Sequence, residues 1–372
     1  MQKEKLEILE QFGLDATPVS CEPYGIGHIN LTYLVVTESG RWYILQKIND
    51  RTFCNVEKLM DNIVSVTGFL RSKTADPRCV LTLVETHDGG SYLHTQNEYW
   101  RMYHFVEDTI CLQHPESDED FYQSAIGFGT FQQLLSDFPA EKLHETIPNF
   151  HNTPARYRML LETLERTPIH RAAQVQPELE FVLARKEEMA TIQKSLASGE
   201  LPLRVTHNDT KLNNILLDAK TRKAVCVIDL DTVMPGSVLY DFGDSIRFGA
   251  ATAAEDEKDL SKMEMSIERF RVFTRGYLYA CPGLTEKELA LLPLAAKTMT
   301  LECGVRFLTD YLDGDHYYAV HRDGQNLDRA RTQFKLVADM EQKFDKMKRI
   351  IAEEAKRRKN DAAPESHQSQ NT

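Results

Sequence analysis

The chain has 372 residues, of which 42% are hydrophobic, and this is enough for two lobes with cores of their own. The formal net charge of -12 argues against a nucleic-acid partner, because proteins that bind phosphate backbones usually present a basic face. Seven cysteines without a Cys-x-x-Cys pair argue against a disulfide framework and a zinc site. We see no signal peptide and no apolar run near the ~20 residues that span a bilayer, so we expect a cytoplasmic protein with no membrane partner.

The first hundred residues predict an antiparallel sheet interrupted by one helix. Hydrophobic alternation and the turn Glu38-Ser39-Gly40 predict strands at residues 19–24, 31–37, 42–48, 80–84 and 99–106. Apolar residues at helical spacing from Val56 to Val66, behind a possible Asn55 cap, predict the helix. We expect these elements to form a small nucleotide-binding lobe over residues 1–110.

From about residue 115 the pattern becomes helical. Pro177 and Gly199 are expected to open and close one helix, and Thr285 with Glu288 predicts a capping box at the start of another. The acidic residues Glu116, Asp118, Glu119 and Asp120 are typical of a solvated helix start, although an acidic surface also attracts amine-bearing substrates. We expect a catalytic and substrate-binding lobe over residues 111–355, followed by a disordered tail at 356–372, where periodicity is lost and Ser, Gln and Asn accumulate.

One loop carries the residue types that phosphoryl transfer needs, in the order His207-Asn208-Asp209-Thr210-Lys211-Leu212-Asn213-Asn214, and Asp229 follows in Val-Ile-Asp-Leu-Asp. Short apolar runs at 215–217 and 225–227 predict a hairpin that brings Asn214 and Asp229 to the same end. Carboxylate and amide oxygens there suit a hard cation, and Asp209 lies on the entering loop, where it can receive a hydroxyl proton. Each motif taken alone is also compatible with an ordinary surface turn.

These segments resemble the aminoglycoside and choline kinase-like phosphotransferases, whose loop reads His-x-Asp-x4-Asn before an Ile-Asp pair. Within that superfamily the chain is similar to the N-acetylhexosamine 1-kinases over about residues 20 to 350, through the segments 24–30, 206–214, 228–232, 241–249 and 302–308. The resemblance implies an α+β, two-lobed protein-kinase-like fold with an antiparallel-sheet small lobe and a mostly helical large lobe. It implies Asp209 as catalytic base, and Asn214, Asp229 and Asp231 as magnesium ligands, with ATP as co-substrate.

Two features of the small lobe concern the nucleotide. Gly25 and Gly27 lie between expected strands, where backbone without a Cβ can approach phosphate oxygens, although an ordinary hairpin turn is the alternative. The lysine that contacts phosphates in protein kinases corresponds to Gln46 or Lys47, which alternation places on opposite faces. The resembled sugar kinases carry glutamine there, so Lys47 is left out of the site.

The resemblance also implies an N-acetylhexosamine pocket formed by His28, Asp209, Thr232, Phe248, Arg306 and Tyr317, a mixture suited to hydroxyl groups and sugar rings. From the residues alone, aromatics such as Phe248 and Tyr317 are more often part of the core, and an arginine on a helical face such as Arg306 is more often a surface ion-pair residue. Asp244 and Arg247 are compatible with a structural pair that supports the metal loop.

The expected reaction is transfer of the ATP γ-phosphate to the anomeric 1-hydroxyl of N-acetylglucosamine or N-acetylgalactosamine, with Mg2+ and a small-molecule sugar as the partners. The alternatives are a kinase for choline, homoserine, an aminoglycoside or another sugar, and a nucleotide-binding pseudokinase. The preferred sugar and the oligomeric state stay open at this stage.

Overall fold

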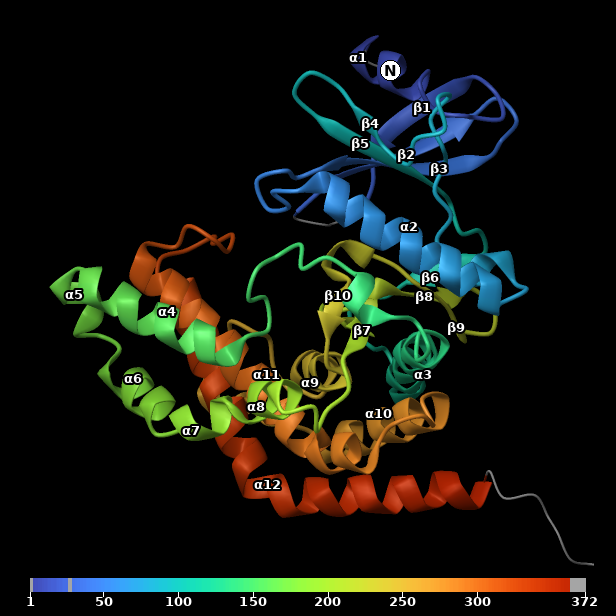
Figure 1. Cartoon of the computed structure of the whole chain (residues 1–372). Helices are drawn as coiled ribbons and strands as arrows, with labels where there is room; N and C mark the ends of the chain where they lie inside the picture. The colour runs from blue at the N-terminus through green and yellow to red at the C-terminus, as the bar shows by residue number, and fades with distance from the viewer. Residues whose placement is uncertain (1–2, 26–28, 362–372) are drawn as a thin grey trace, which may run out of the picture.

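The computed structural model describes residues 3–25 and 29–361, and it divides the chain into a sheet-based small lobe and a larger helical lobe (Figure 1). The antiparallel small-lobe sheet has the strand order β1-β2-β3-β5-β4. Its strands are β1 (Pro18–Pro23), β2 (Leu31–Thr37), β3 (Trp42–Ile48), β4 (Leu93–His94) and β5 (Tyr99–His104). One face, with Tyr43 and Leu45, packs in a core that includes Leu9 of α1 (Lys3–Leu9), and the sequence prediction of the sheet lobe is confirmed.

Helix α2 (Val56–Lys73) lies between the sheet and the large lobe (Figure 1). The Asn55 side chain accepts a hydrogen bond from the Lys58 amide at 2.9 Å, so the predicted cap is confirmed. Leu59 and Ile63 of the helix are fully buried in a cluster that also contains Leu230 of the large lobe. The second face of the sheet and α2 therefore share one apolar core with the lobe below.

The large lobe contains two small antiparallel sheets surrounded by helices. One sheet joins β6 (Thr109–Cys111), β8 (Ile215–Asp218) and β9 (Ala224–Val227), and the other joins β7 (Arg204–Thr206) and β10 (Met234–Gly236). The helices are α3 (Asp118–Leu134), α4 (Thr153–Arg166), α5 (Ile169–Ala172), α6 (Gln176–Leu183), α7 (Lys186–Met189), α8 (Thr191–Ala197), α9 (Val238–Gly249), α10 (Ile267–Ala280), α11 (Glu286–Asp313) and α12 (Gln325–Asp361). Short 3-10 turns include η1 (Pro77–Cys79), η2 (Ala140–Lys142), η3 (Leu212–Asn214), η4 (Leu230–Thr232) and η5 (Leu260–Lys262).

Helix α9 is the centre of the large lobe and is buried on almost every side. Its Phe242 ring makes edge contacts with the rings of Phe273 and Tyr277, at centroid distances of 5.7 and 5.5 Å. Gly243 lets α11 approach, because a Cβ there would lie 2.5 Å from the Ala295 carbonyl oxygen. The packing fixes a helix whose buried Asp241 and Asp244 contact the loop 207–214, with buried Arg247 one turn after Asp244.

Three expectations differ from the structure. Residues 80–84 form no strand of their own: Val80 follows η1, and only Leu83 makes an isolated bridge, to Tyr103. The helix expected over 177–199 is divided into α6, α7 and α8: the backbone leaves helical geometry at Arg185, with φ of -111° and ψ of 7°, and the Arg185 side chain pairs with Glu341 of α12. The predicted tail begins as helix, since α12 continues through residue 361 on good helix formers; residues 362–372 lie outside the described part.

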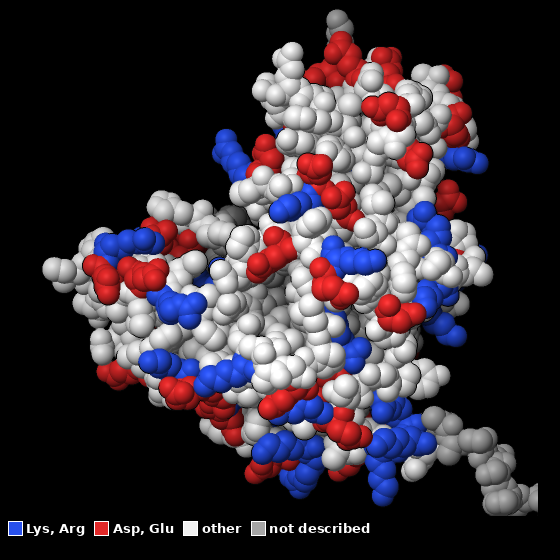
Figure 2. Space-filling model, viewed as in Figure 1, with Lys and Arg blue, Asp and Glu red and all other residues white. Residues whose placement is uncertain are grey.

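Other predicted details agree with the structure. Thr285 and Glu288 form the capping box of α11, and the acidic segment at 116–120 contains the capped start of α3. On the face shown in Figure 2, Lys and Arg side chains are interspersed with Asp and Glu over the large lobe, while acidic side chains predominate on the upper part of the small lobe. Among the described residues, no helix combines the length and the apolar character needed to cross a bilayer.

Candidate active site

The β8–β9 hairpin places the two expected oxygen ligands side by side. Ile215 pairs with Val227, and the Ile228 amide donates to the Asn214 carbonyl oxygen at 2.9 Å. Asn214 therefore ends η3 immediately before β8, while Asp229 follows β9 at the same end of the hairpin. The hairpin prediction is confirmed.

Asp209 lies within hydrogen-bonding distance of a cation and an amide. Its Oδ1 is 2.8 Å from Lys211 Nζ, and its Oδ2 accepts from Asn214 Nδ2 at 3.1 Å. Burial acts against ionisation, but Lys211 and the neighbouring His207 outweigh it and hold the pKa of Asp209 below its ordinary value. A carboxylate that is ionised at neutral pH is suited to orient an acceptor hydroxyl and to receive its proton.

The catalytic loop is held from below by α9. Asp241 accepts hydrogen bonds from the His207 and Asn208 amides at 2.9 and 2.8 Å, and Asp244 accepts from the Thr210 amide at 3.2 Å. Asn208 adopts a left-handed backbone with φ of 66°, a conformation that asparagine tolerates better than most residues. These buried carboxylates fix the strained turn that presents Asp209.

A second buried pair supports the same loop from α11. His151 Nδ1 lies 2.7 Å from Glu302 Oε1, and His151 Nε2 lies 3.2 Å from the Asn208 carbonyl oxygen. Although burial opposes ionisation, His151 holds the pKa of Glu302 below its usual value. A cavity of about 360 Å³ beside these residues is lined in part by Phe150 and Tyr240.

Asp229 is the carboxylate whose surroundings most strongly favour a bound cation. Its backbone is left-handed, with φ of 58°, and the residue keeps an exposed surface. Although part of the residue is exposed to solvent, desolvation of the carboxyl group by the surrounding protein, together with the nearby Asp231 and Asp209 carboxylates, raises the pKa of Asp229 to about 7. Asn214 and Asp229 remain the candidate ligands for a hard divalent cation, while no group of three or more Asp, Glu, His or Cys side chains within residues 3–25 and 29–361 is arranged to hold one.

Asp231, also expected as a ligand, is already engaged by the small lobe. Its Oδ1 lies 2.5 Å from Arg101 Nη1, and its Oδ2 accepts from Asn30 Nδ2 at 2.5 Å. The residue is buried at the start of η4. Both oxygens thus face small-lobe side chains in this structure.

The strand register assigns opposite sides to Gln46 and Lys47. Gln46 pairs with Arg101 of β5, and its Oε1 accepts from Arg101 Nε and Nη2 at 3.0 and 2.9 Å. Lys47 points to the other face and forms an ion pair with Glu98. The cation on the Asp231 side of the sheet is therefore Arg101. Gly25 is exposed with φ of 75°, whereas Gly27 and His28 lie outside the described residues.

The remaining residues expected to contact sugar occupy different environments. The Thr232 hydroxyl is buried and donates to the His207 carbonyl oxygen at 2.6 Å. Phe248, at the end of α9, stacks on His114 with a centroid distance of 6.1 Å. Arg306 of α11 places its guanidinium carbon 5.9 Å from the centre of the Tyr317 ring, which is 63% exposed. Asp244 and Arg247 form the expected pair at 2.8 Å.

Three contributors escaped the sequence prediction. Lys211 had a local signal, since it lies two residues after Asp209 in the same loop. Arg101 and the His151–Glu302 pair had none, because each acts on residues that are distant in the sequence.

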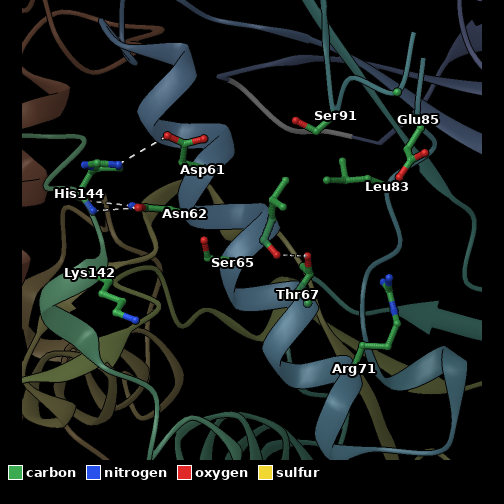
Figure 3. Close-up of a pocket in the computed structure, with 13 residues that line it drawn as sticks. Asp61, Asn62, Ser65, Thr67, Arg71, Leu83, Glu85, Ser91, Lys142 and His144 are labelled. Carbon is green, nitrogen blue, oxygen red and sulfur yellow. Dashed lines mark hydrogen bonds and ion pairs between the residues drawn. The ribbon is translucent and has the colours of Figure 1, made fainter. Parts of the chain in front are cut away.

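A second cavity, of about 580 Å³, lies elsewhere, beside α2 (Figure 3). Residues of α2, of segment 83–91 and of segment 142–144 line it. Asn62 accepts from the His144 amide at 2.8 Å and donates to the Val233 carbonyl oxygen at 2.9 Å. This wall of the cavity is thus a contact between the lobes.

A sequence profile described as "Phosphotransferase enzyme family" matches residues 20–263, which include the small-lobe sheet, the catalytic loop and α9. The chain belongs to this phosphotransferase family. Membership agrees with the arrangement of Asp209, Asn214 and Asp229 on one loop and one hairpin.

Solved structures with the same phosphotransferase fold include three with different acceptors in their descriptions. A microcompartment-associated aminopropanol kinase is 16% identical, with a TM-score of 0.64 over 93% of this chain and 98% of that one. A choline kinase from Streptococcus pneumoniae is 16% identical, with a TM-score of 0.52 over 90% and 97%. An amicoumacin kinase in complex with AMP-PNP and Ca2+ is 15% identical, with a TM-score of 0.58 over 92% and 93%. At these identities the likeness establishes the fold.

Proposed function

We propose that this phosphotransferase transfers the ATP γ-phosphate to the anomeric 1-hydroxyl of an N-acetylhexosamine, giving the sugar 1-phosphate and ADP. The observation that carries the proposal is the cationic, aromatic character of the candidate acceptor side. The Arg306 guanidinium carbon lies 5.1, 5.9 and 5.7 Å from the ring centres of Phe150, Tyr317 and Tyr318. A half-buried guanidinium in front of aromatic rings suits a neutral sugar with hydroxyl and acetamide oxygens, and it repels an ammonium group.

The proposed chemistry assigns one task to each residue of the loop. Asp209 orients the acceptor hydroxyl and takes its proton, while Lys211 keeps the Asp209 carboxylate ionised. Asn214 and Asp229 would hold the magnesium ion, which neutralises charge on the transferring phosphoryl group when it is bound. Transfer then needs no phosphoenzyme, because acceptor and nucleotide meet at the same end of the hairpin.

The nucleotide base has a suitable aromatic surface where β5 leaves the small lobe. Trp42 and Tyr24 make edge contacts with Phe105 at centroid distances of 5.1 and 6.1 Å, and Trp42 and Tyr24 are both 44% exposed. Exposed aromatic faces favour stacking of a planar base. We propose this cluster as the adenine side of the site and Gly25 as part of the phosphate side.

A kinase for an amine-bearing alcohol is the second candidate. Similar structures are described as aminopropanol and choline kinases, and three aromatic rings around one cation are an arrangement that also recognises ammonium groups. In this chain Arg306 already holds that position. Arg306 therefore separates the two candidates.

The test is Mg2+- and ATP-dependent phosphorylation of N-acetylglucosamine, N-acetylgalactosamine, glucose, galactose, choline, aminopropanol and kanamycin, with ADP release and the phosphorylated position both measured. Phosphate at C1 of an acetylhexosamine supports the proposal, and Arg306→Ala should then lower kcat/KM for that sugar while KM for ATP stays unchanged. Arg166→Ala, at an exposed α4 position, is the matched control and should have no effect. Activity confined to choline or aminopropanol would reject the sugar as the acceptor. If none of the acceptors in the panel produced ADP release, all of these substrates would be rejected.

A further inference from the structure

The loop that follows β9 is held by the small lobe at two points. At the first, Arg101 of β5 reaches Asp231, and Asn30 occupies the second oxygen of the same carboxylate. At the other, Asn62 of α2, which Figure 3 shows beside His144, donates to the Val233 carbonyl oxygen. Asp229, the candidate magnesium ligand, lies at the start of this loop.

The contacts continue into the strands that surround the nucleotide side. Asn30 Oδ1 accepts from the Asn49 amide at 2.9 Å, which ties the beginning of β2 to the end of β3. Gln46, in the middle of β3, accepts both remaining contacts of the Arg101 guanidinium. One cation thus joins β3, β5 and the metal loop across the lobe boundary.

Stabilisation of the fold does not by itself explain the Arg101–Asp231 ion pair. Arg101 is 1% exposed and Asp231 is 3% exposed, so both charges have lost their water. A buried ion pair repays that desolvation only partly, and a well-packed apolar pair of similar size is often at least as stable. Arg101 Nη1 and Asp231 Oδ1 lie 2.5 Å apart, so the two charges are in direct contact across the lobe boundary.

We propose that Arg101 is a positioning residue for phosphoryl transfer: by holding Asp231, it fixes the loop that carries Asp229 against the nucleotide-binding lobe. The inference rests on the proposed phosphotransfer function but not on the identity of the acceptor. Arg101 does not contact substrate in this assignment. Arg101 contacts Gln46 on the face of β3 that is turned toward Asp231 and so links the two lobes. Lys47 pairs with Glu98 on the opposite face.

The test measures ADP affinity by calorimetry, once with Mg2+ and once with EDTA, together with the melting temperature and turnover. Arg101→Met alone would leave Asp231 buried without its cation, so the informative variant is the uncharged double change Arg101→Met with Asp231→Asn. Lys47→Met is the matched control, because it removes a cation from the neighbouring position on the other face of β3.

We expect the double variant to melt near the wild-type temperature and to bind ADP normally in EDTA. Its affinity for ADP with Mg2+ should fall about 10- to 100-fold, the range typical of lost support for a metal ligand, and turnover should fall with it. Lys47→Met should match the wild type in all four measurements. Wild-type Mg2+-dependent ADP binding in the double variant, or an equal loss in Lys47→Met, would overturn the inference.

If the double variant does not fold, Gln46→Met is tested in its place, because this change removes an uncharged partner of Arg101 and leaves both charges in place. The same Mg2+-specific weakening supports the inference, and unchanged affinity overturns it. The proposed acceptor fails separately: a wild-type protein that binds ADP with Mg2+ but phosphorylates no acetylhexosamine would refute the sugar proposal and leave the role of Arg101 standing.

Discussion

Replacing Asp209 by Asn tests the centre of the proposed chemistry with little change of shape. The amide keeps an oxygen near Asn214 Nδ2, which lies 3.1 Å from Asp209 Oδ2, but it loses the charge that faces Lys211 Nζ at 2.8 Å and cannot receive a proton. General bases contribute about 10²- to 10⁴-fold in rate. At about 1.36 kcal/mol per factor of ten, we expect the activation free energy to rise by about 3–5 kcal/mol and turnover to fall accordingly.

The assay is ADP release in the presence of Mg2+ and the best acceptor, with ADP binding measured in parallel. Nucleotide affinity should change little, because Asn214 and Asp229 are intact. Asp137→Asn is the control, since Asp137 also pairs with a lysine, Lys73 at 2.6 Å, but at an exposed position. Turnover of Asp209→Asn within about tenfold of the wild type would refute the assignment of Asp209 as base.

Lys211→Met should raise the pKa of Asp209 and move the acidic limb of the kcat/KM profile to higher pH; an unmoved limb would exclude Lys211 as the controlling cation. In the folded protein the pKa of Asp229 is raised from its ordinary value of 3.8 to about 7. Ionisation of Asp229 therefore destabilises the metal-free fold. Asp229→Asn should therefore melt above the wild type by a margin that grows from about pH 4 to pH 7 and then stays constant, and a pH-independent margin would contradict this cause. Gly243→Ala should lower the free energy of unfolding in urea by about 1–3 kcal/mol, because its Cβ would meet α11. Gly68→Ala, on the exposed face of α2, has no atom within 4 Å of its Cβ and should be neutral or stabilising by up to about 1 kcal/mol, so equal losses would refute the packing argument.

Local patterns predicted the fold where local chemistry decides it. The strands at 31–37 and 42–48 match β2 and β3, because alternation and a tight turn both constrain a hairpin. Helix α2 likewise begins at its Asn55 cap. The helix expected over 177–199 was divided at Arg185, whose ion pair with Glu341 of α12 joins residues that are distant in the sequence and that no local pattern records.

In the candidate site, too, local patterns predicted some residues, and contacts between distant parts of the chain determined the others. Asp209, Asn214 and Asp229 were accessible because one loop and one hairpin bring them together, and the pairing of β8 with β9 places Asn214 beside Asp229. Alternation also showed that Gln46 and Lys47 point to opposite faces. It could not show which face meets the large lobe, because that depends on the pairing of β3 with β5 and on the burial of Arg101 against Asp231.

The dependence on Arg101 has a physical consequence for how the two lobes work together. A loop held only by its own lobe would keep Asp229 near Asn214 whether or not the small lobe was aligned. Here Asp231 and Val233 are held by Arg101 and Asn62 of the small lobe, so misalignment of the lobes would also displace the Asp229 carboxylate. Metal binding and lobe alignment should therefore be coupled, and each should strengthen the other by the same factor, because binding free energies are reciprocal.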